Sequence, residues 1–319
     1  MKQKVRKAVV RQFNLKRLVF VALALLLGLA IAFVLGEISG RGIAEYYRFT
    51  RSREIQNDFS QADALKILCL GDSHTAGAEA PPGKSYPDYL LRLIGESCDI
   101  GPVEIINFGF AGSDMTEMRT RMEKFLPTLT YRPDFMLIQG GVNDVDNWLN
   151  LRVYIETNGI ETPWWFLPSS RVLVMRFAET ATSKKLFAAP DYLAYVGKQV
   201  DREYTRLVTM CREMGIQPVL LNYASYEPNP IFPVVEATAE HLRAPFIRFR
   251  QPETVDMMGE RGWRAPGGHP NARGYLFMAQ VVLLGLQRLF PERFICQTDF
   301  LPDEYLLQPE VKADSSLGE

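Results

Sequence analysis

Short apolar segments alternate with longer segments of helical spacing along the middle of the chain. The apolar runs have the length of strands, are bounded by Gly, Pro or polar residues, and lie at residues 67–70, 103–108, 135–139, 218–222 and 246–249. The segments with helical spacing lie at residues 87–94, 116–126, 191–214, 233–242 and 271–289. This alternation predicts an α/β domain over residues 64–296, with helices on both faces of a parallel sheet of about five strands.

Two segments fall outside this alternation. Residues 145–190 are rich in Trp, Pro and Arg and show little periodicity. Long excursions of this kind in compact domains are often functional, so we expect a lid-like insertion here. Residues 297–319 carry six Asp or Glu and one Lys, which predicts a solvated acidic tail.

The N-terminal region has the pattern of a membrane anchor. Residues 18–36 contain no charged side chain, and as a helix they extend roughly 28 Å, about the thickness of the bilayer hydrocarbon. Residues 1–17 carry seven Lys or Arg and no acid, against four Arg in residues 37–57. The positive-inside rule then predicts a cytoplasmic segment at 1–17, a single transmembrane anchor at 18–36 and a spacer at 37–63. We therefore expect the main domain to lie outside the cytoplasmic membrane.

A cleaved signal peptide is the alternative interpretation of this region. Ala30-Ile31-Ala32 has the small-x-small form of a cleavage site. Both interpretations give the main domain the same location. The formal net charge of the whole chain is −1, so composition provides no general argument for nucleic-acid binding.

An extracytoplasmic location would allow disulfides among the four cysteines, which are Cys69, Cys98, Cys211 and Cys296. Four cysteines allow three full pairings, and the sequence does not choose among them. Cys69 lies within an apolar run, so we expect it to be a buried thiol. No CxxC pair or His/Cys cluster occurs, so we expect no structural zinc or other metal site.

Residues that can carry chemistry follow the predicted strands. Ligands of open parallel sheets bind at the carboxyl ends of the strands. The segments at these ends, or before the last helix, are 71–75 (GDSHT), 107–112 (NFGFAG), 140–144 (GGVND) and 267–271 (GGHPN). They bring a serine, a glycine-rich turn, an asparagine and a histidine to one edge. Acyl transfer needs these parts: a nucleophile, donors for an oxyanion, and a base.

Each of these residues also has a structural interpretation. Ser73 and Asn143 belong to residue types that commonly cap helices, and His269 could cap the last helix. Gly109 and Gly112 suit ordinary turns. The chemical interpretation is favoured because all of them lie at strand ends on one rim.

The residues of these segments and their order along the chain resemble the motifs of the SGNH subgroup of the GDSL esterases and lipases. Residues 71–77 (GDSHTAG) match the first block of that family, with His74 in place of the usual Leu. Asn107, Gly109 and Gly112 resemble the second block, residues 141–144 (GVND) match the third, and His269-Pro270-Asn271 with Gly274 resembles the last. The resemblance covers roughly residues 64–290.

This resemblance implies a fold and a set of roles. The fold is a flavodoxin-like three-layer α/β/α sandwich, and no metal or organic cofactor is needed. Ser73 is the nucleophile and His269 the general base. The oxyanion hole is formed by the backbone N–H groups of Ser73 and Gly112 and by the side-chain amide of Asn143. The supporting residues of the matching blocks are Asp72, Gly141 and Asp144.

The small number of histidines points to the same base. The chain has three, and His74 is adjacent to Ser73, so its ring is poorly placed to reach the Ser73 hydroxyl. His241 lies in a predicted helix and suits a structural role. His269 remains as the base.

One position departs from the family pattern. The last block usually carries Asp three residues before the histidine, and here that residue is Pro266. In the serine-protease template, spoiling this carboxylate costs about 10⁴ in kcat. A backbone carbonyl could orient His269, the site could be weak or inactive, or a carboxylate from elsewhere could substitute. The candidates for such a carboxylate are Glu253, Asp256 and Glu260.

The sequence therefore predicts a membrane-anchored, extracytoplasmic serine esterase. Its expected substrate is a carboxylic ester of a lipid or of an acylated polysaccharide, hydrolysed through an acyl-enzyme. One alternative is a polysaccharide O-acyltransferase of the same fold, which passes the acyl group to a sugar hydroxyl. Another is a catalytically weak module that binds a glycan or a partner.

Overall fold

The computed structural model describes residues 19–36, 38–39, 58–161, 185–224, 229–249, 261–266 and 268–297. The chain divides into two compact units. The first comprises residues 1–53 and 161–185 and contains the N-terminal helix. The second comprises residues 54–160 and 186–319 and contains the sheet with its helices.

The second unit is built on a five-stranded sheet in which all strands are parallel. The strands are β1 (Leu65–Gly71), β2 (Val103–Gly109), β3 (Phe135–Gln139), β4 (Gln217–Leu221) and β5 (Phe246–Ile247). Their order in the sheet is β2-β1-β3-β4-β5. This is the flavodoxin-like doubly wound order, so the predicted fold class is confirmed.

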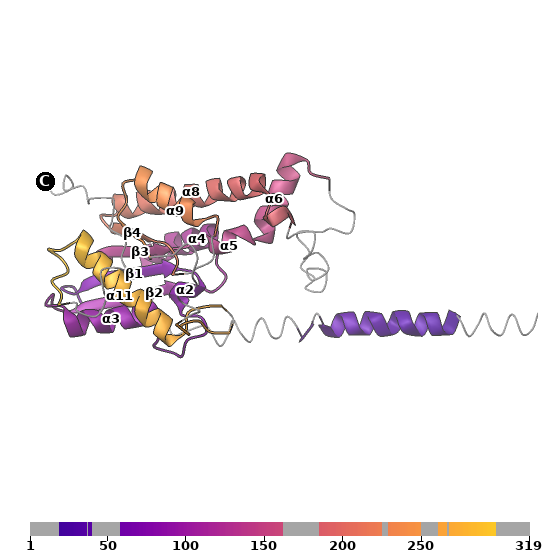
Figure 1. Cartoon of the computed structure of the whole chain (residues 1–319), viewed down its shortest axis with the longest axis horizontal. Helices are drawn as coiled ribbons and strands as arrows, with labels where there is room; N and C mark the ends of the chain where they lie inside the picture. Colours follow the sequence, from indigo (N-terminus) through magenta and orange to yellow (C-terminus); the bar gives the residue numbers. More distant parts are fainter. Residues whose placement is uncertain are drawn as a thin grey trace, which may run out of the picture. The chain divides into compact units, whose positions relative to one another are not determined.

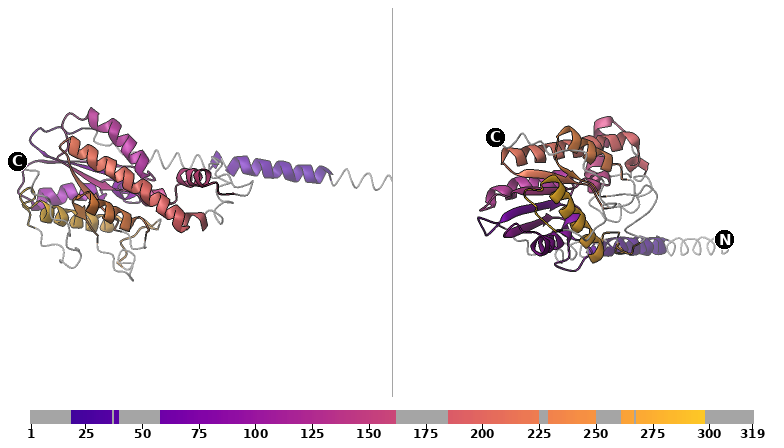
Figure 2. Two further views of the ribbon diagram at one scale, coloured as in Figure 1. Left: turned by 90° about the horizontal axis from the view of Figure 1, so that it is seen from above. Right: turned by 60° about the vertical axis from the view of Figure 1, so that its left-hand side comes forward.

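Helices cover both faces of the sheet (Figures 1 and 2). On one face lie α3 (Tyr86–Ser97) and α11 (Ala272–Leu289), and on the other lie α4 (Met115–Phe125), α8 (Pro190–Glu213) and α9 (Phe232–His241). Shorter elements are α2 (Ser73–Ala76), α5 (Val142–Val145) and the 3₁₀ turn η1 (Leu126–Thr128). Each of the five predicted long helices matches an observed one to within a few residues.

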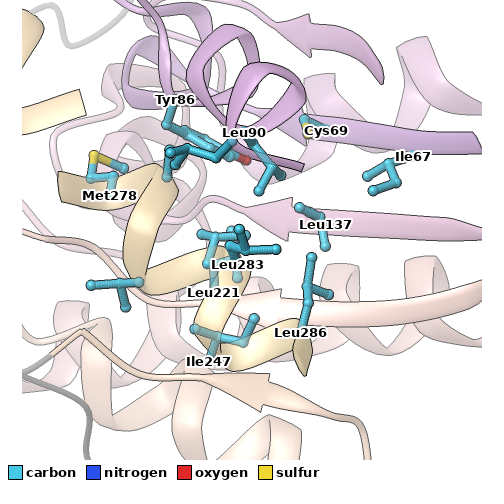
Figure 3. Packing of buried hydrophobic residues seen from close by; sticks show 14 of the residues in the cluster. Ile67, Cys69, Tyr86, Leu90, Leu137, Leu221, Ile247, Met278, Leu283 and Leu286 are labelled. Carbon is cyan, nitrogen blue, oxygen red and sulfur yellow. The ribbon is translucent and has the colours of Figure 1, made fainter. Parts of the chain in front are cut away.

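The sheet is buried on both faces, which explains the continuous apolar runs of its strands. Figure 3 shows the core between the sheet and the pair α3 and α11. The labelled sheet residues of this core are Ile67, Cys69, Leu137, Leu221 and Ile247, and the labelled helix residues are Tyr86, Leu90, Met278, Leu283 and Leu286. Cys69 is a buried free thiol, as the apolar run predicted.

Strand β5 is shorter than the sequence predicted. It covers two residues, whereas the apolar pattern suggested 246–249. Arg248 forms an ion pair with Glu236 of α9, and the Phe249 N–H donates to the Asn222 side chain instead of a neighbouring strand. The charged residue that interrupts the apolar run thus ends the strand.

The predicted lid segment contains a helix that the sequence did not indicate. Helix α6 (Trp148–Asn158) begins after Asn147, whose side-chain oxygen accepts hydrogen bonds from the backbone N–H groups of Leu149 and Asn150. Residues 162–184 of the expected lid lie outside the described residues.

The boundary between spacer and domain also differs from the expectation. Phe59 is fully buried, and the Ser60 backbone N–H donates to the Glu104 carboxylate. Residues 58–63, assigned to the spacer from the sequence, therefore already pack on the domain.

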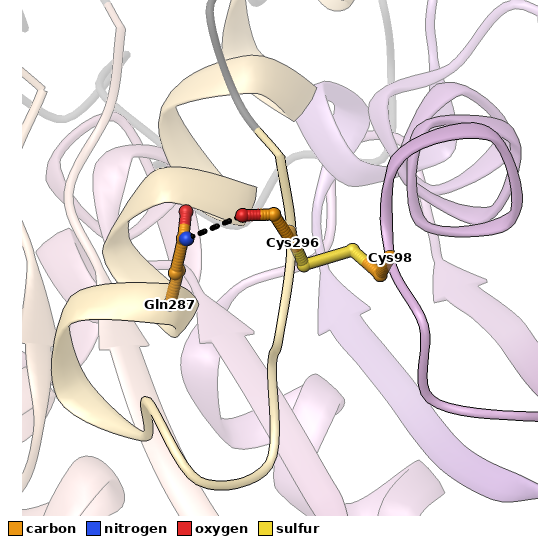
Figure 4. Close-up of a disulfide and its surroundings, with 3 residues drawn as sticks. All are labelled: Cys98, Gln287 and Cys296. Carbon is orange, nitrogen blue, oxygen red and sulfur yellow. Dashed lines mark hydrogen bonds between the residues drawn. A yellow bond between two sulfur atoms is a disulfide. The ribbon is translucent and has the colours of Figure 1, made fainter.

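A disulfide joins Cys98 and Cys296, which are separated by 198 residues (Figure 4). It links the end of α3 to the segment that follows α11. Two backbone hydrogen bonds flank it, from Asp99 to Ile295 and from Gln297 to Ser97. The Gln287 side chain of α11 donates to the Cys296 carbonyl. The structure thus pairs Cys98 with Cys296 and leaves Cys69 and Cys211 as buried free thiols.

The N-terminal helix Val19–Gly36 is the one helix among the described residues that is long and apolar enough to cross a membrane. A signal sequence near the N-terminus has the same length and composition, so both sequence interpretations fit this helix.

Candidate functional site

The candidate site lies at the carboxyl edge of the sheet, where β1 and β3 are neighbours. The chain leaves β1 toward β2 on one side and leaves β3 toward β4 on the other, and ligands of doubly wound sheets bind at such a switch point. The segments after β1, β2 and β3, together with the residues before α11, provide the side chains predicted from the sequence.

Ser73 is the first residue of α2, immediately after β1. The Asp72 side chain caps this short helix by accepting a hydrogen bond of 2.9 Å from the His74 backbone N–H. Helix α2 lies close to the sheet, because a Cβ added at Gly109 would stand 2.3 Å from the Ala76 backbone nitrogen. Glycine at 109 is therefore required for α2, and with it Ser73, to hold its position.

Ser73 and His269 meet although they are 196 residues apart in the sequence. The His269 Nε2 atom lies 2.9 Å from the Ser73 Oγ atom, within hydrogen-bond distance. His269 immediately precedes Pro270 and Asn271, and the Asn271 side chain caps α11. The predicted nucleophile and base are thus brought together by the packing of α11 against the sheet.

The carboxylate beside His269 comes from a residue that the sequence analysis missed. Glu79 Oε2 lies 3.2 Å from His269 Nδ1 and 3.2 Å from the His269 backbone nitrogen. The three acidic candidates named from the sequence all lie outside the described residues. The backbone of Glu79 is unusual: its φ is +64°, a left-handed conformation that is uncommon for a residue other than glycine.

The loop after β2 is fastened to the other strand ends. The Phe110 N–H donates to the Gly71 carbonyl at 2.9 Å. The Asn143 side-chain amide donates to the Ser113 carbonyl at 3.0 Å, next to the exposed Gly112. Asn143, in α5, is therefore placed next to the loop that carries Gly112.

Two of the motif residues brace the backbone. Asn107 accepts from the Gly109 N–H and donates to the Ser85 hydroxyl, so its side chain holds the end of β2. Gly141 has a φ of +107°, a conformation that favours glycine, and a Cβ there would stand 2.7 Å from Ile231. These contacts agree with the supporting role predicted for Gly141.

Two buried carboxyl groups lie beside the candidate site. Burial raises the pKa of Asp72 to about 6, against the opposing effect of the hydrogen bonds that it accepts from Tyr223 and His74. Burial also raises the pKa of Asp144 to about 8, opposed by the bond from the Met115 N–H and reinforced by the negative charge of Asp114. The Asp144 carboxyl group accepts from Met115, the first residue of α4, and so holds the loop that precedes α4.

The other two histidines have the placement that the sequence suggested. The His74 ring packs 5.5 Å from the His269 ring and 5.0 Å from Tyr223, measured between ring centroids. Burial and the neighbouring His269 lower the pKa of His74 to about 3, which keeps its ring neutral. His241 lies on α9 and contacts the Ala237 carbonyl within its own helix.

The described residues contain no group of three or more His, Cys, Asp or Glu side chains arranged to hold a metal ion. What the site does contain is a hydroxyl, an imidazole and a carboxylate in hydrogen-bonded sequence, near the amide of Asn143 in α5 and the loop that carries Gly112. This arrangement can transfer a proton from the hydroxyl to the imidazole while the oxygen attacks a carbonyl carbon.

Residues 69–276 match the family described as GDSL-like Lipase/Acylhydrolase. A search of curated proteins finds no match.

Solved structures with a similar fold include three proteins from bacteria. A protein described as lipolytic and of the G-D-S-L family, from Desulfitobacterium hafniense, is 14% identical with a TM-score of 0.45, covering 68% of this chain and 97% of its own. The acetylxylan esterase Axe2 of Geobacillus stearothermophilus is 16% identical with a TM-score of 0.45, covering 71% and 96%. The psychrotrophic esterase EstA of a Pseudoalteromonas species is 15% identical with a TM-score of 0.45, covering 73% and 98%.

Proposed function

This chain belongs to the GDSL-like lipase/acylhydrolase family, whose members hydrolyse ester bonds, and we propose that it is a membrane-anchored serine esterase that acts outside the cytoplasmic membrane. The observation that carries the proposal is the 2.9 Å contact between Ser73 Oγ and His269 Nε2. The substrate is a carboxylic ester, either of a lipid or of an acylated polysaccharide.

The reaction has two halves. Ser73 Oγ attacks the ester carbonyl carbon while His269 Nε2 takes the hydroxyl proton. The carbonyl oxygen becomes an oxyanion, stabilised by the Ser73 and Gly112 backbone N–H groups and by the Asn143 amide. The intermediate then breaks the bond to the alcohol oxygen, which receives the proton from His269. In the second half, a water molecule gives a proton to His269 Nε2 as its oxygen attacks the acyl carbon. The bond between that carbon and Ser73 Oγ then breaks, Ser73 Oγ takes the proton from His269, and the acid leaves.

Two observations support the location. The helix Val19–Gly36 is apolar along its length, and seven basic residues precede it in residues 1–17. The Cys98–Cys296 disulfide fits an oxidising compartment, because disulfides are rare in the cytosol. Protease added to spheroplasts tests the sidedness: an extracytoplasmic domain is digested, whereas a cytoplasmic one is protected.

Activity is tested with the full chain in detergent micelles, on a series of aryl esters from acetyl to long acyl groups. Wild type is expected to turn over, and Ser73→Ala and His269→Ala are each expected to lose hydrolysis. The chain-length preference then separates a deacetylase from a lipase. His241→Ala is the matched control, because this exposed imidazole lies on α9 and contacts its own helix. Full activity in Ser73→Ala would contradict the assignment.

A further inference from the structure

We propose that Glu79 is the positioning carboxylate of this site, in the role that the family pattern gives to a residue at position 266. The inference rests on the proposed esterase function and adds a residue to it. Glu79 lies six residues after the nucleophile, whereas the usual carboxylate precedes the histidine. The charge that orients His269 therefore comes from the loop of Ser73 itself.

The contact defines the tautomer of His269. A carboxylate oxygen accepts hydrogen bonds, so the Nδ1 atom that faces Glu79 Oε2 at 3.2 Å carries a proton and donates it. In the neutral ring, Nε2 is then unprotonated and accepts from the Ser73 hydroxyl at 2.9 Å. This is the protonation pattern that a general base needs.

The same carboxylate also fixes the histidine backbone. Glu79 Oε2 accepts from the His269 backbone N–H at 3.2 Å, so one oxygen holds both the ring and the main chain of His269. The side chains of His269 and Glu79 are 25% and 24% exposed, which leaves the pair partly shielded from water. Partial shielding strengthens the charge–dipole interaction relative to a fully exposed pair.

The loop that carries Glu79 is held from both sides. The Ala78 N–H donates to the Ser73 carbonyl at 2.9 Å, which closes the loop behind α2. The Tyr275 hydroxyl of α11 donates to the Ala78 carbonyl at 3.0 Å. Because α11 directly follows the His269 turn, one helix anchors both partners of the carboxylate–imidazole contact.

The backbone at Glu79 supports a functional role independently of the contact. Its φ of +64° places an L side chain in the left-handed region, which costs about 1–2 kcal/mol relative to the usual conformation. Glycine would fit this position without that cost. A strained residue that is also held by contacts of its neighbours is typical of functional sites.

Position 266 itself cannot provide the carboxylate, because it is a proline. Pro266 lies in a tight turn in which the Gly268 N–H donates to the Ala265 carbonyl at 3.0 Å. The Ala265 N–H donates to the His269 carbonyl at 2.8 Å. Asp72, the acidic residue next to the nucleophile, is engaged with Tyr223 and with the His74 N–H.

Three variants of the full chain test the role. Glu79→Gln keeps an oxygen that can accept from the His269 backbone and removes the charge. Glu79→Gly removes the side chain and relieves the positive φ, so it keeps the fold intact. Arg243→Gly is the matched control, because Arg243 is the other described non-glycine residue with a positive φ, at +48°, and belongs to no part of the site.

We expect Glu79→Gln and Glu79→Gly to lower kcat by about 10²- to 10⁴-fold on the best aryl ester, with KM little changed, by analogy with the protease template. The melting temperature of Glu79→Gly should equal or exceed that of wild type. Added formate should partly restore kcat in Glu79→Gly, since it can enter the space left by the side chain. Arg243→Gly should retain wild-type kcat.

The outcomes separate the two proposals. If wild type is active and both Glu79 variants keep its kcat, the role of Glu79 is wrong and the esterase function stands. If kcat falls only together with the melting temperature and formate has no effect, Glu79 is structural and the inference also fails. If wild type hydrolyses no ester, the rate of Ser73 labelling by a fluorophosphonate tests Glu79 instead: it should fall in both variants, and an unchanged rate overturns the inference.

Discussion

The Tyr223 phenol donates a hydrogen bond to the Asp72 carboxylate, directly before the proposed nucleophile Ser73. Tyr223 follows β4 and Asp72 follows β1, so this contact joins two strand ends that are not neighbours in the sheet. Asp72 in turn caps α2 through the His74 N–H. The position of Ser73 thus depends on the buried Tyr223–Asp72 hydrogen bond, which no local sequence pattern predicts.

Tyr223→Phe should destabilise the protein by about 1.5–3 kcal/mol near pH 8, because the hydrogen bond it removes is made to a charged group. The loss should be smaller near pH 5, since the pKa of Asp72 is about 6 and the carboxyl group is then largely neutral. Urea unfolding at the two pH values measures the difference. Tyr192→Phe is the control. The Tyr192 hydroxyl donates to the uncharged Val145 carbonyl, so the stability lost in this variant should be the same at both pH values.

The free energy of unfolding should depend on pH through the titration of Asp144. Its pKa rises from 3.8 to about 8 on folding, so between about pH 4 and pH 8 the native state holds a proton that the unfolded chain has released. Stability from this group is present at low pH and is lost as the pH rises through that window.

Asp144→Asn removes this titration and keeps an oxygen to accept from the Met115 N–H. The variant should be more stable than wild type near pH 8, by on the order of a few kcal/mol, and should show a flatter dependence on pH. Urea unfolding between about pH 5 and pH 8 tests this. The exposed Asp146→Asn serves as control and should follow wild type; an equal slope in Asp144→Asn would contradict the prediction.

Removing the disulfide should weaken the fold without removing its chemistry. The bridge closes a separation of 198 residues, and loss of a native disulfide typically costs about 2–5 kcal/mol. The double variant Cys98→Ala/Cys296→Ala should show that decrease in urea unfolding while its kcat on aryl esters stays near wild type. A reductant should produce the same decrease in wild type and no further decrease in the double variant; an effect on both would point away from this bridge.

Asn143→Ala should lower kcat by about 10²- to 10³-fold, the effect of losing one oxyanion donor. It also removes the bond to the Ser113 carbonyl that holds the loop carrying Gly112. Steady-state kinetics on the preferred aryl ester measure the change. Asn158→Ala is the control, because its amide donates within α6 to the Tyr154 carbonyl, and its kcat should match wild type.

The sequence by itself predicted the regular elements and a candidate nucleophile and base, Ser73 and His269, which the structure brings within hydrogen-bond distance. Strands buried on both faces produce continuous apolar runs, and helices packed on one side produce a periodic pattern, so both are visible locally. The segments after the strands were informative for a related reason, because parallel strands bring all their carboxyl ends to one edge. Ser73, His269, Asn143 and Gly112 could be named as candidates from that placement together with the family resemblance of the surrounding motifs.

Only the tertiary structure decided which carboxylate faces His269, which cysteines pair and where β5 ends. Glu79 and His269 are 190 residues apart, and their contact depends on how α11 packs beside the α2 loop. Cys98 and Cys296 pair because the chain returns from α11 to the end of α3. Contacts of this kind arise from the packing of whole elements, so neither periodicity nor a short motif contains them.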